Sequence, residues 1–558
     1  MKINENSDVE WTEKVESTSS VRNPLGLWDH LNIQVDYVPG ITSVTRRIRY
    51  YSLWAWYYNN LFEGRIINQK DFERLFILTC LAHHKGDYKN DSFSDLHNKE
   101  RFKDDWSSID TFKLDKSFVI SGQGYSYYNA QLTKLRCYWL DQLNQLHKSP
   151  INVKLAKSFP VVDEDFFKQK QFTREEILEN LSEFCLCKKY PLEIDVMTKL
   201  FFGFIKNDGD EWHIDEKAYK QFMEEKILDL DYKGFEVNTE EIIISTAPVY
   251  QEMNQRRRNT LFMFLKIIAE TNPQNSEMYK AIWDAIYFRQ NTNNSEKIDF
   301  KGLDKVLKSW ELLQLNVYYV YSVEKIFDVV QKIVIDDNGI LKEKLLSTLE
   351  EGRILETIKL ASKKNITVES KIGDLIQSIY SHSKIDDGLR AEINESKLYE
   401  HISKTNQLEE ILANVFVMLV LLKRRFETVD KNIIEEARLE KNIYIKDKLR
   451  IDKLFQYIED SKDQNIISFF DYLIKSVIER HLYESNIRLS QNGTKNWVFL
   501  EEDSRLFFSK KELITIRPRD NRWNSIRSLM RDIEMIKVDD KISLTDKGKQ
   551  WLQQAKLI

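Results

Sequence analysis

Apolar residues recur at helical spacing along most of this chain. The residues from Thr42 to Leu61 combine this spacing with many Trp and Tyr side chains, which bury large areas when packed. The apolar run Ile411–Leu422 contains Asn414 and is too short to cross a bilayer, so it predicts a buried helix. The same spacing predicts further helices at Gln69–His84, at Tyr127–Leu146, from Pro248 through Arg256-Arg-Arg258, and at Gly302–Ile335.

Thr173 marks a predicted helix start in the first half of the chain. A threonine followed by Glu175 and Glu176 is typical of a helix N-terminus, because the hydroxyl caps backbone N–H groups and acidic residues favour that end. The preceding segment, Asn152–Phe172, shows no clear period and predicts a loop.

The last sixty residues follow the order of a winged helix. Two apolar runs flank the acidic turn Glu501–Ser504 and predict a small hairpin. A helix with one apolar face then precedes two short strands around Asp539-Asp540, and Thr545 caps a final helix. The runs are Trp497–Leu500 and Leu506–Phe508, the helix covers Ile526–Ile533, and the strands are Ile536–Val538 and Ile542–Leu544.

Composition supports the same picture. The chain has 558 residues with only 16 Gly and 8 Pro, which favours long helices joined by short links. We therefore predict a mainly α, multi-domain helical protein with a small C-terminal winged-helix-like α+β module. The predicted regions are a flexible tail at 1–21, an aromatic-rich helical domain at 22–247, a central helical domain at 248–484 and the winged-helix-like domain at 485–558.

Positive charge gathers near the C-terminus although the net charge is −5. Seven basic residues face only Glu512 and Asp520 in this window, a local excess of +5. Arginine suits phosphate because its planar fork donates two hydrogen bonds to one anion. The cluster predicts either a nucleic-acid surface or a basic rim that pairs with acidic residues of a protein. Its members are Lys510, Lys511, Arg517, Arg519, Arg522, Arg527 and Arg531.

A second basic cluster, Arg46-Arg47-Ile48-Arg49, lies among aromatic residues. Alternating Arg and aromatic side chains bind single strands by following phosphates and stacking on bases, which makes Arg46 and Arg47 candidate nucleic-acid residues. Alternatively, the aromatic residues form a core in which the arginines bind carboxylates. The aromatic density favours this second interpretation.

Signs of catalysis are few. Val368-Glu-Ser-Lys371 matches the E-x-K of restriction-type nucleases, which makes Glu369 and Lys371 the weak catalytic candidates. His83-His84 favours a helix end over a metal site, and Cys185-Leu-Cys187 has no second cysteine pair beside it. No phosphate-binding P-loop motif is present. We expect no cofactor and no metal, and the sequence leans away from an enzyme.

Several pieces of the chain together resemble uncharacterised proteins of bacterial antiviral defence islands. They are Asn23-Pro-Leu-Gly-Leu27, Pro39-Gly40 with Thr45–Tyr51, Trp310 ahead of Tyr318-Tyr319, His481 before the Trp497 hairpin, and the Arg522–Gly548 wing. The resemblance implies a non-catalytic subunit that works with a separately encoded ATPase or nuclease. It also implies a role in recognising invading DNA or a phage product. The basic residues make the winged helix the predicted DNA-binding part.

Two alternatives to a DNA-binding subunit stay open. One is a metal-dependent effector nuclease, and the other is a protein-docking scaffold without nucleic-acid contact. The polar, acidic N-terminus lacks the apolar core of a signal peptide, and the cysteines favour free thiols. We therefore expect a cytoplasmic protein without membrane contact.

Overall fold

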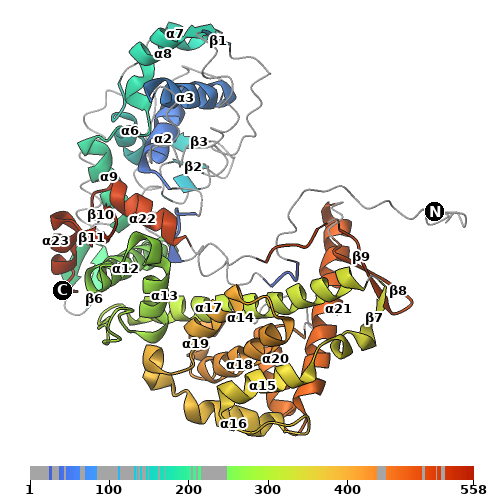
Figure 1. Cartoon of the computed structure of the whole chain (residues 1–558). Helices are drawn as coiled ribbons and strands as arrows, with labels where there is room; N and C mark the ends of the chain where they lie inside the picture. The colour runs from blue at the N-terminus through green and yellow to red at the C-terminus, as the bar shows by residue number, and fades with distance from the viewer. Residues whose placement is uncertain are drawn as a thin grey trace, which may run out of the picture. The chain divides into compact units, whose positions relative to one another are not determined.

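The computed structural model shows a mainly helical protein with a small antiparallel sheet near the C-terminus, as the sequence predicts (Figure 1). It describes residues 24–27, 37–42, 46–62, 69–84, 111–113, 128, 131–132, 135, 138–140, 146–148, 150–160, 162, 164–169, 171–202, 205–208, 211–214, 248–337, 339–436, 448–492, 497–510, 512–516 and 522–558.

The chain forms two compact units, each made of segments that are distant in sequence. The helical unit comprises Met1–Ile33, Trp283–Lys297 and Lys308–Arg519. The wing unit comprises Gln34–Ile282, Ile298–Leu307 and Asp520–Ile558. The boundary falls inside α13 (Met278–Phe288) and α14 (Asp304–Asp336).

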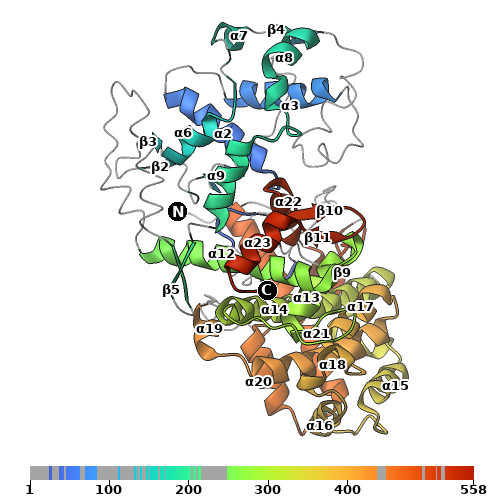
Figure 2. The ribbon, with the colours of Figure 1, turned by 90° about the vertical axis from the view of Figure 1, so that its left-hand side faces the viewer.

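The helices of the wing unit pack in pairs. Helix α2 packs against α6, α3 against α8, and α9 against α12, while α12 also contacts β11 and α23 (Figures 1 and 2). The helices are α2 (Ile48–Phe62), α3 (Gln69–His83), α6 (Pro150–Ala156), α7 (Glu164–Lys168), α8 (Arg174–Leu181), α9 (Pro191–Phe202), α12 (Pro248–Thr271), α22 (Trp523–Asp532) and α23 (Asp546–Gln554), with 3-10 turns η2 (Ser182–Phe184) and η3 (Asn275–Glu277).

The strands of the wing unit form four separate antiparallel pairs. The pairs are β1 (Thr111–Lys113) with β4 (Gln171–Thr173), β2 (Tyr138–Leu140) with β3 (Leu146–Lys148), β5 (Ile205–Asp208) with β6 (Glu211–Ile214), and β10 (Ile536–Val538) with β11 (Ile542–Leu544). The last pair is the predicted wing, with Ile536 opposite Leu544. The Thr545 hydroxyl accepts from the Gly548 N–H and caps α23, as expected.

The helical unit is built around α14 and α18. Every residue from Ile411 to Leu422 in α18 is buried, which confirms the buried helix predicted there. The elements are β7 (Ile340–Leu341), η4 (Lys342–Lys344), η5 (Leu346–Thr348), α15 (Glu351–Ser362), α16 (Ile372–His382), η6 (Ile385–Arg390), α17 (Glu395–Lys404), α18 (Leu408–Phe426), α19 (Lys431–Glu436), α20 (Ile451–Asp460), α21 (Ile466–Asn492), β8 (Phe499–Glu502) and β9 (Arg505–Phe508).

A three-stranded sheet, β7-β9-β8, lies at one end of the helical unit. The hairpin β8–β9 was predicted, and Asp503 and Ser504 close it with positive φ values of 47° and 62°, as two-residue hairpin turns require. The third strand, β7, was not predicted. It pairs Ile340 with Leu506.

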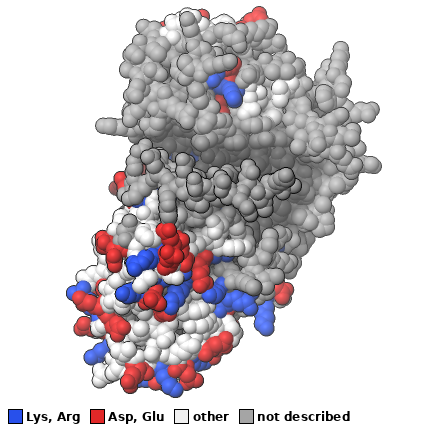
Figure 3. All heavy atoms as spheres, turned by 90° about the vertical axis from the view of Figure 1, so that its right-hand side faces the viewer, with Lys and Arg blue, Asp and Glu red and all other residues white. Residues whose placement is uncertain are grey.

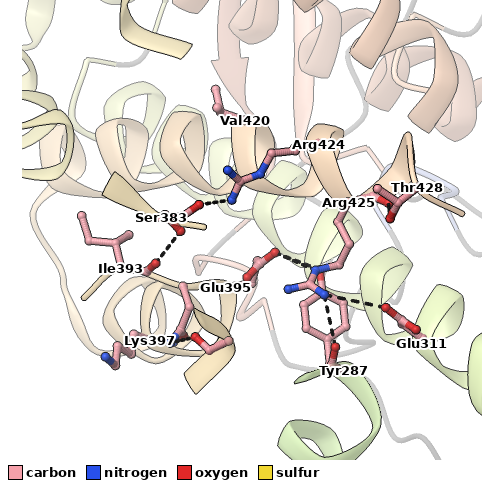
Figure 4. A network of polar contacts seen from close by, with 12 residues as sticks. Tyr287, Glu311, Ser383, Ile393, Glu395, Lys397, Val420, Arg424, Arg425 and Thr428 are labelled. Atoms are coloured by element: carbon pink, nitrogen blue, oxygen red, sulfur yellow. Dashed lines mark hydrogen bonds and ion pairs between the residues drawn. The ribbon is translucent and has the colours of Figure 1, made fainter. Parts of the chain in front are cut away.

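A polar network lies at the C-terminal end of α18. The Arg425 guanidinium lies 3.0 Å from Glu395 Oε1 and 3.7 Å from Glu311 Oε1, and it stacks 4.2 Å from the centre of the Tyr287 ring (Figure 4). Arg424 points the other way and donates to the carbonyl of Ser383 (Figure 4). Burial raises the pKa of Glu311 above its usual range. The network therefore fixes the helix end with paired charges.

His481 lies buried in the middle of α21. Its Nδ1 donates to the Pro24 carbonyl at 3.0 Å, and its Nε2 accepts from the Val498 N–H at 3.0 Å. Burial lowers the pKa of His481 to about 4, so the ring is neutral at pH 7. This histidine joins the Pro24–Leu27 turn to α21 and the hairpin. Its role is structural.

Three expectations differ from the structure. The predicted helix Tyr127–Leu146 is wrong where β2 forms, because Tyr138 and Trp139 favour strands. The predicted loop Asn152–Phe172 is wrong where α6, α7 and β4 form. Pro150 begins α6, the helix position that tolerates proline, but helices of 7 and 5 residues carry little periodic signal.

The compact units also differ from the predicted domains 22–247, 248–484 and 485–558. The C-terminal region divides near Arg519, because the hairpin β8–β9 pairs with β7 whereas β11 and α23 pack on α12. The predicted tail 1–21 lies outside the described residues.

Candidate metal centre and predicted nucleic-acid residues

Two short segments of the wing unit place histidine and cysteine side chains together. His83 and His84 stand at the C-terminal end of α3. Cys185 and Cys187 lie in the turn after η2, where the Cys185 N–H donates to the Ser182 carbonyl and the Lys188 N–H donates to the Cys185 carbonyl. Helix α3 packs against α8 and η2, which brings the two segments into contact.

The four side chains converge on one point. The Cys185 Sγ lies 3.2 Å from His84 Nε2, and the Cys187 Sγ lies 3.4 Å from His83 Nδ1. One donor atom from each of the four residues lies within 4.8 Å of the others. Cys185 is buried and the other three are partly buried.

Neighbouring groups influence the titration of these side chains. Burial, followed by the charge of Lys188, lowers the pKa of His83. The hydrogen bond with Cys185, together with burial, raises the pKa of the Cys187 thiol. His83 and Cys187 therefore favour their neutral forms when no cation is bound.

Arg47 and Arg49 both donate hydrogen bonds to backbone carbonyls in or next to this turn. Arg47 donates from a terminal nitrogen to the Leu186 carbonyl at 2.9 Å, between the two cysteines. Arg49 donates to the Glu183 carbonyl and pairs with the buried Glu193 at 3.3 Å. Both guanidinium groups thus hold the cysteine segment against α2.

Arg47 also binds Asp532 of α22. The Arg47 Nε lies 2.8 Å from Asp532 Oδ2, and the Ile48 N–H donates to the same oxygen at 3.2 Å. The two side chains are 4% and 2% exposed. Of the two interpretations of the Arg46–Arg49 cluster, the structure shows carboxylate binding inside the core for Arg47 and Arg49, while Arg46 is partly exposed.

The C-terminal basic residues that the structure describes contact groups of the fold. Arg522 donates to the Ile41 carbonyl at 2.7 Å, and Arg527 donates to Asn275 Oδ1 at 2.6 Å. Arg531 lies 3.9 Å from Asp532 Oδ1. Burial lowers the pKa of Lys510, which belongs to the helical unit. Lys511, Arg517 and Arg519 lie outside the described residues.

Helix α22 holds the position that a recognition helix has in a winged helix, directly before the wing. Seven of its ten residues are buried in the wing unit, including Trp523, which stacks on Phe264. The wing turn carries Asp539 and Asp540, and the Asp540 carbonyl accepts from the Asn275 N–H at 2.8 Å. The other three residues, Asn524, Arg527 and Arg531, are partly exposed and lie on one face of the helix, where Arg527 contacts Asn275 and Arg531 contacts Asp532.

The weak nuclease candidates do not have the expected geometry. Glu369 lies in an exposed turn instead of a strand, and Lys371 precedes α16 and pairs with Asp463 at 2.9 Å. Both partners of that pair are exposed. The strand placement that an E-x-K site needs is therefore wrong.

Comparisons with known proteins add no relative: no family model, curated protein or solved structure matches this chain. Within the described ranges, no helix is both long and apolar enough to cross a membrane.

The sequence did not predict the histidine–cysteine cluster, because each of its two motifs alone has too few ligands for a metal site. His83-His84 and Cys185-Leu-Cys187 each supply two donors, and their ligand atoms meet across an interval of 101 residues. The sequence signal that could have indicated a metal site was the presence of two pairs of metal-binding residues. Their proximity depends on the packing of α3 on η2.

Proposed function

We propose that this chain is a non-catalytic scaffold subunit of a bacterial antiviral defence complex, working through protein contacts with a separately encoded ATPase or nuclease. The resemblance described above supplies the setting. The structure supports the protein-docking alternative over DNA binding through the winged-helix-like module.

The buried Arg47–Asp532 pair carries this preference. A recognition helix must offer its polar face to a groove. In α22, polar groups are instead engaged within the wing unit, because Asp532 binds Arg47 at 2.8 Å and Arg527 donates to Asn275 Oδ1 at 2.6 Å. Separating a buried ion pair leaves an uncompensated charge, which costs about 3–5 kcal/mol. The module therefore serves as part of the scaffold.

The described surface of the helical unit fits a protein-facing role. On the face that Figure 3 shows, Lys and Arg side chains are interspersed with Asp and Glu. Nucleic-acid surfaces instead concentrate positive charge on one face. Alternating charges of this kind suit contacts with another protein, in which opposite charges fix the register.

The full chain, expressed with its gene neighbours, provides the test. We expect it to co-purify with an ATPase or nuclease and to show no tight, salt-sensitive binding to labelled duplex DNA. Each phosphate contact would add about −0.9 to the slope of log K against log salt.

Two charge-reversal variants distinguish a protein-docking scaffold from a DNA-binding subunit. Arg517→Glu/Arg519→Glu alters the predicted DNA residues, and Lys537→Glu/Lys541→Glu alters exposed wing residues without touching the Arg47–Asp532 pair. Tight, salt-sensitive DNA binding that either variant abolishes would overturn the scaffold proposal. So would the absence of any co-purifying partner.

A further inference from the structure

The histidine–cysteine cluster has the dimensions of a tetrahedral metal site. Zinc lies about 2.3 Å from cysteine sulfur and about 2.0–2.1 Å from histidine nitrogen, so donors at the corners of a tetrahedron stand about 3.3–3.8 Å apart. The two sulfur–nitrogen distances here are 3.2 and 3.4 Å, and no pair of donor atoms exceeds 4.8 Å. Small rotations of the side chains suffice to close the site.

The donor set distinguishes among metals. Two thiolates with two imidazoles are ligands that zinc takes in structural sites, whereas magnesium and calcium prefer oxygen. Four protein donors also leave no open position for a substrate or water. This composition fits a structural centre rather than a catalytic one.

Charge balance supports the same assignment. Two thiolates neutralise one divalent cation, and the imidazoles add no charge. A neutral centre is compatible with the buried Cys185 and with the neighbouring positive groups Arg47 and Lys188. A buried cation without compensating negative charge would carry a large desolvation free energy.

The surroundings hold the ligands in position. Arg47 binds the Leu186 carbonyl between the two cysteines, and the Cys185 N–H and carbonyl both make turn hydrogen bonds. The two histidines follow one another at the end of a packed helix. Both halves of the site are therefore fixed by the fold.

We propose that His83, His84, Cys185 and Cys187 bind one structural Zn²⁺ ion, which clamps the end of α3 to the turn after η2. This site is independent of the scaffold function proposed above. We therefore expect zinc in the purified full chain whether or not a partner or DNA is bound.

Metal analysis of the full chain, purified without chelators, tests the proposal. We expect about one zinc ion per chain, and X-ray absorption showing two sulfur ligands at about 2.3 Å and two nitrogen ligands at about 2.0–2.1 Å. These measurements need no variant. A chain with less than about a tenth of an equivalent of zinc that also takes up none on titration would overturn the proposal, as would a ligand shell with fewer than two sulfurs.

Variants then assign the ligands. Cys185→Ser/Cys187→Ser should lower the zinc content at least tenfold, and His83→Asn/His84→Asn should do the same. His382→Asn/His401→Asn is the matched control, because both histidines are exposed in the helical unit and do not belong to the four. Full zinc content in either double variant, or its loss in the control alone, contradicts the assignment.

Discussion

Removing the Asp532 carboxylate should destabilise the wing unit strongly. In Asp532→Ala, the Arg47 guanidinium, whose side chain is 4% exposed, loses its ion-pair partner, and the Ile48 N–H at the start of α2 loses its acceptor. Leaving one member of a buried pair costs about 3–5 kcal/mol, and a lost helix cap costs about 1 kcal/mol. Because one oxygen makes both contacts, we expect a total of about 4 kcal/mol.

Hydrogen exchange followed by mass spectrometry measures this loss locally. The opening free energies of peptides from α2 and α22 report on the wing unit without assuming that the whole chain unfolds in one step. Asp539→Asn is the control, since Asp539 forms an exposed ion pair with Lys537. Surface pairs contribute about 0–1 kcal/mol, so exchange there should change little.

A double variant checks the physical cause. In Arg47→Met/Asp532→Leu neither charge of this pair is left buried, so about half of the lost stability should return. The rest, about 1 kcal/mol each, is the lost acceptor for the Ile48 N–H and the lost hydrogen bond to the Leu186 carbonyl. The reasoning fails if Asp532→Ala lowers the opening free energy by less than about 1 kcal/mol. It also fails if the double variant is as unstable as the sum of the single ones.

Three further outcomes concern single positions. Because the pKa of His481 falls from 6.5 to about 4 on folding, the helical unit should lose about 3 kcal/mol of stability between pH 7 and pH 4, a loss that His481→Gln removes in pH-dependent unfolding. Gly26→Ala places a Cβ 2.4 Å from Glu484 Oε2 at φ 66° and should cost about 2 kcal/mol in chemical unfolding, whereas Gly352→Ala, with open space in α15, should be neutral or stabilising. Thr545→Ala removes the cap of α23 and should speed exchange in that helix, with a cost of about 1 kcal/mol.

Features that depend on neighbouring residues were predictable from the sequence. The helix caps at Thr173 and Thr545, the wing strands and the buried helix α18 each express a local pattern, and the structure contains all of them. Strand β7 has only two residues, too few for such a pattern, and its pairing with β9 depends on a segment more than 160 residues further along the chain.

The candidate sites required information that local patterns do not hold. A basic cluster has the same sequence whether its arginines face phosphate or a buried carboxylate. Arg47 binds Asp532 across 485 residues, and Arg49 binds Glu193 across 144. The metal donors are likewise separated by about a hundred residues. Only the packing of α2, α3 and α22 decides their roles.

Arg47 links the proposed zinc centre to the winged-helix-like module. Its terminal nitrogen binds the Leu186 carbonyl inside the cysteine turn, and its Nε binds Asp532 at the end of α22. If zinc orders this turn, removing the metal should release one of the two anchors of the guanidinium. We therefore expect faster hydrogen exchange in α22 as well as in the turn.

Chelation of the full chain tests this link. Exchange in peptides covering Cys185–Lys188 and α22 should rise after zinc is removed and return when zinc is added. Peptides from α18 are the control, because that helix lies within the core of the helical unit. Faster exchange in the turn with none in α22 would show that Asp532 alone holds Arg47. The wing would then be independent of the metal.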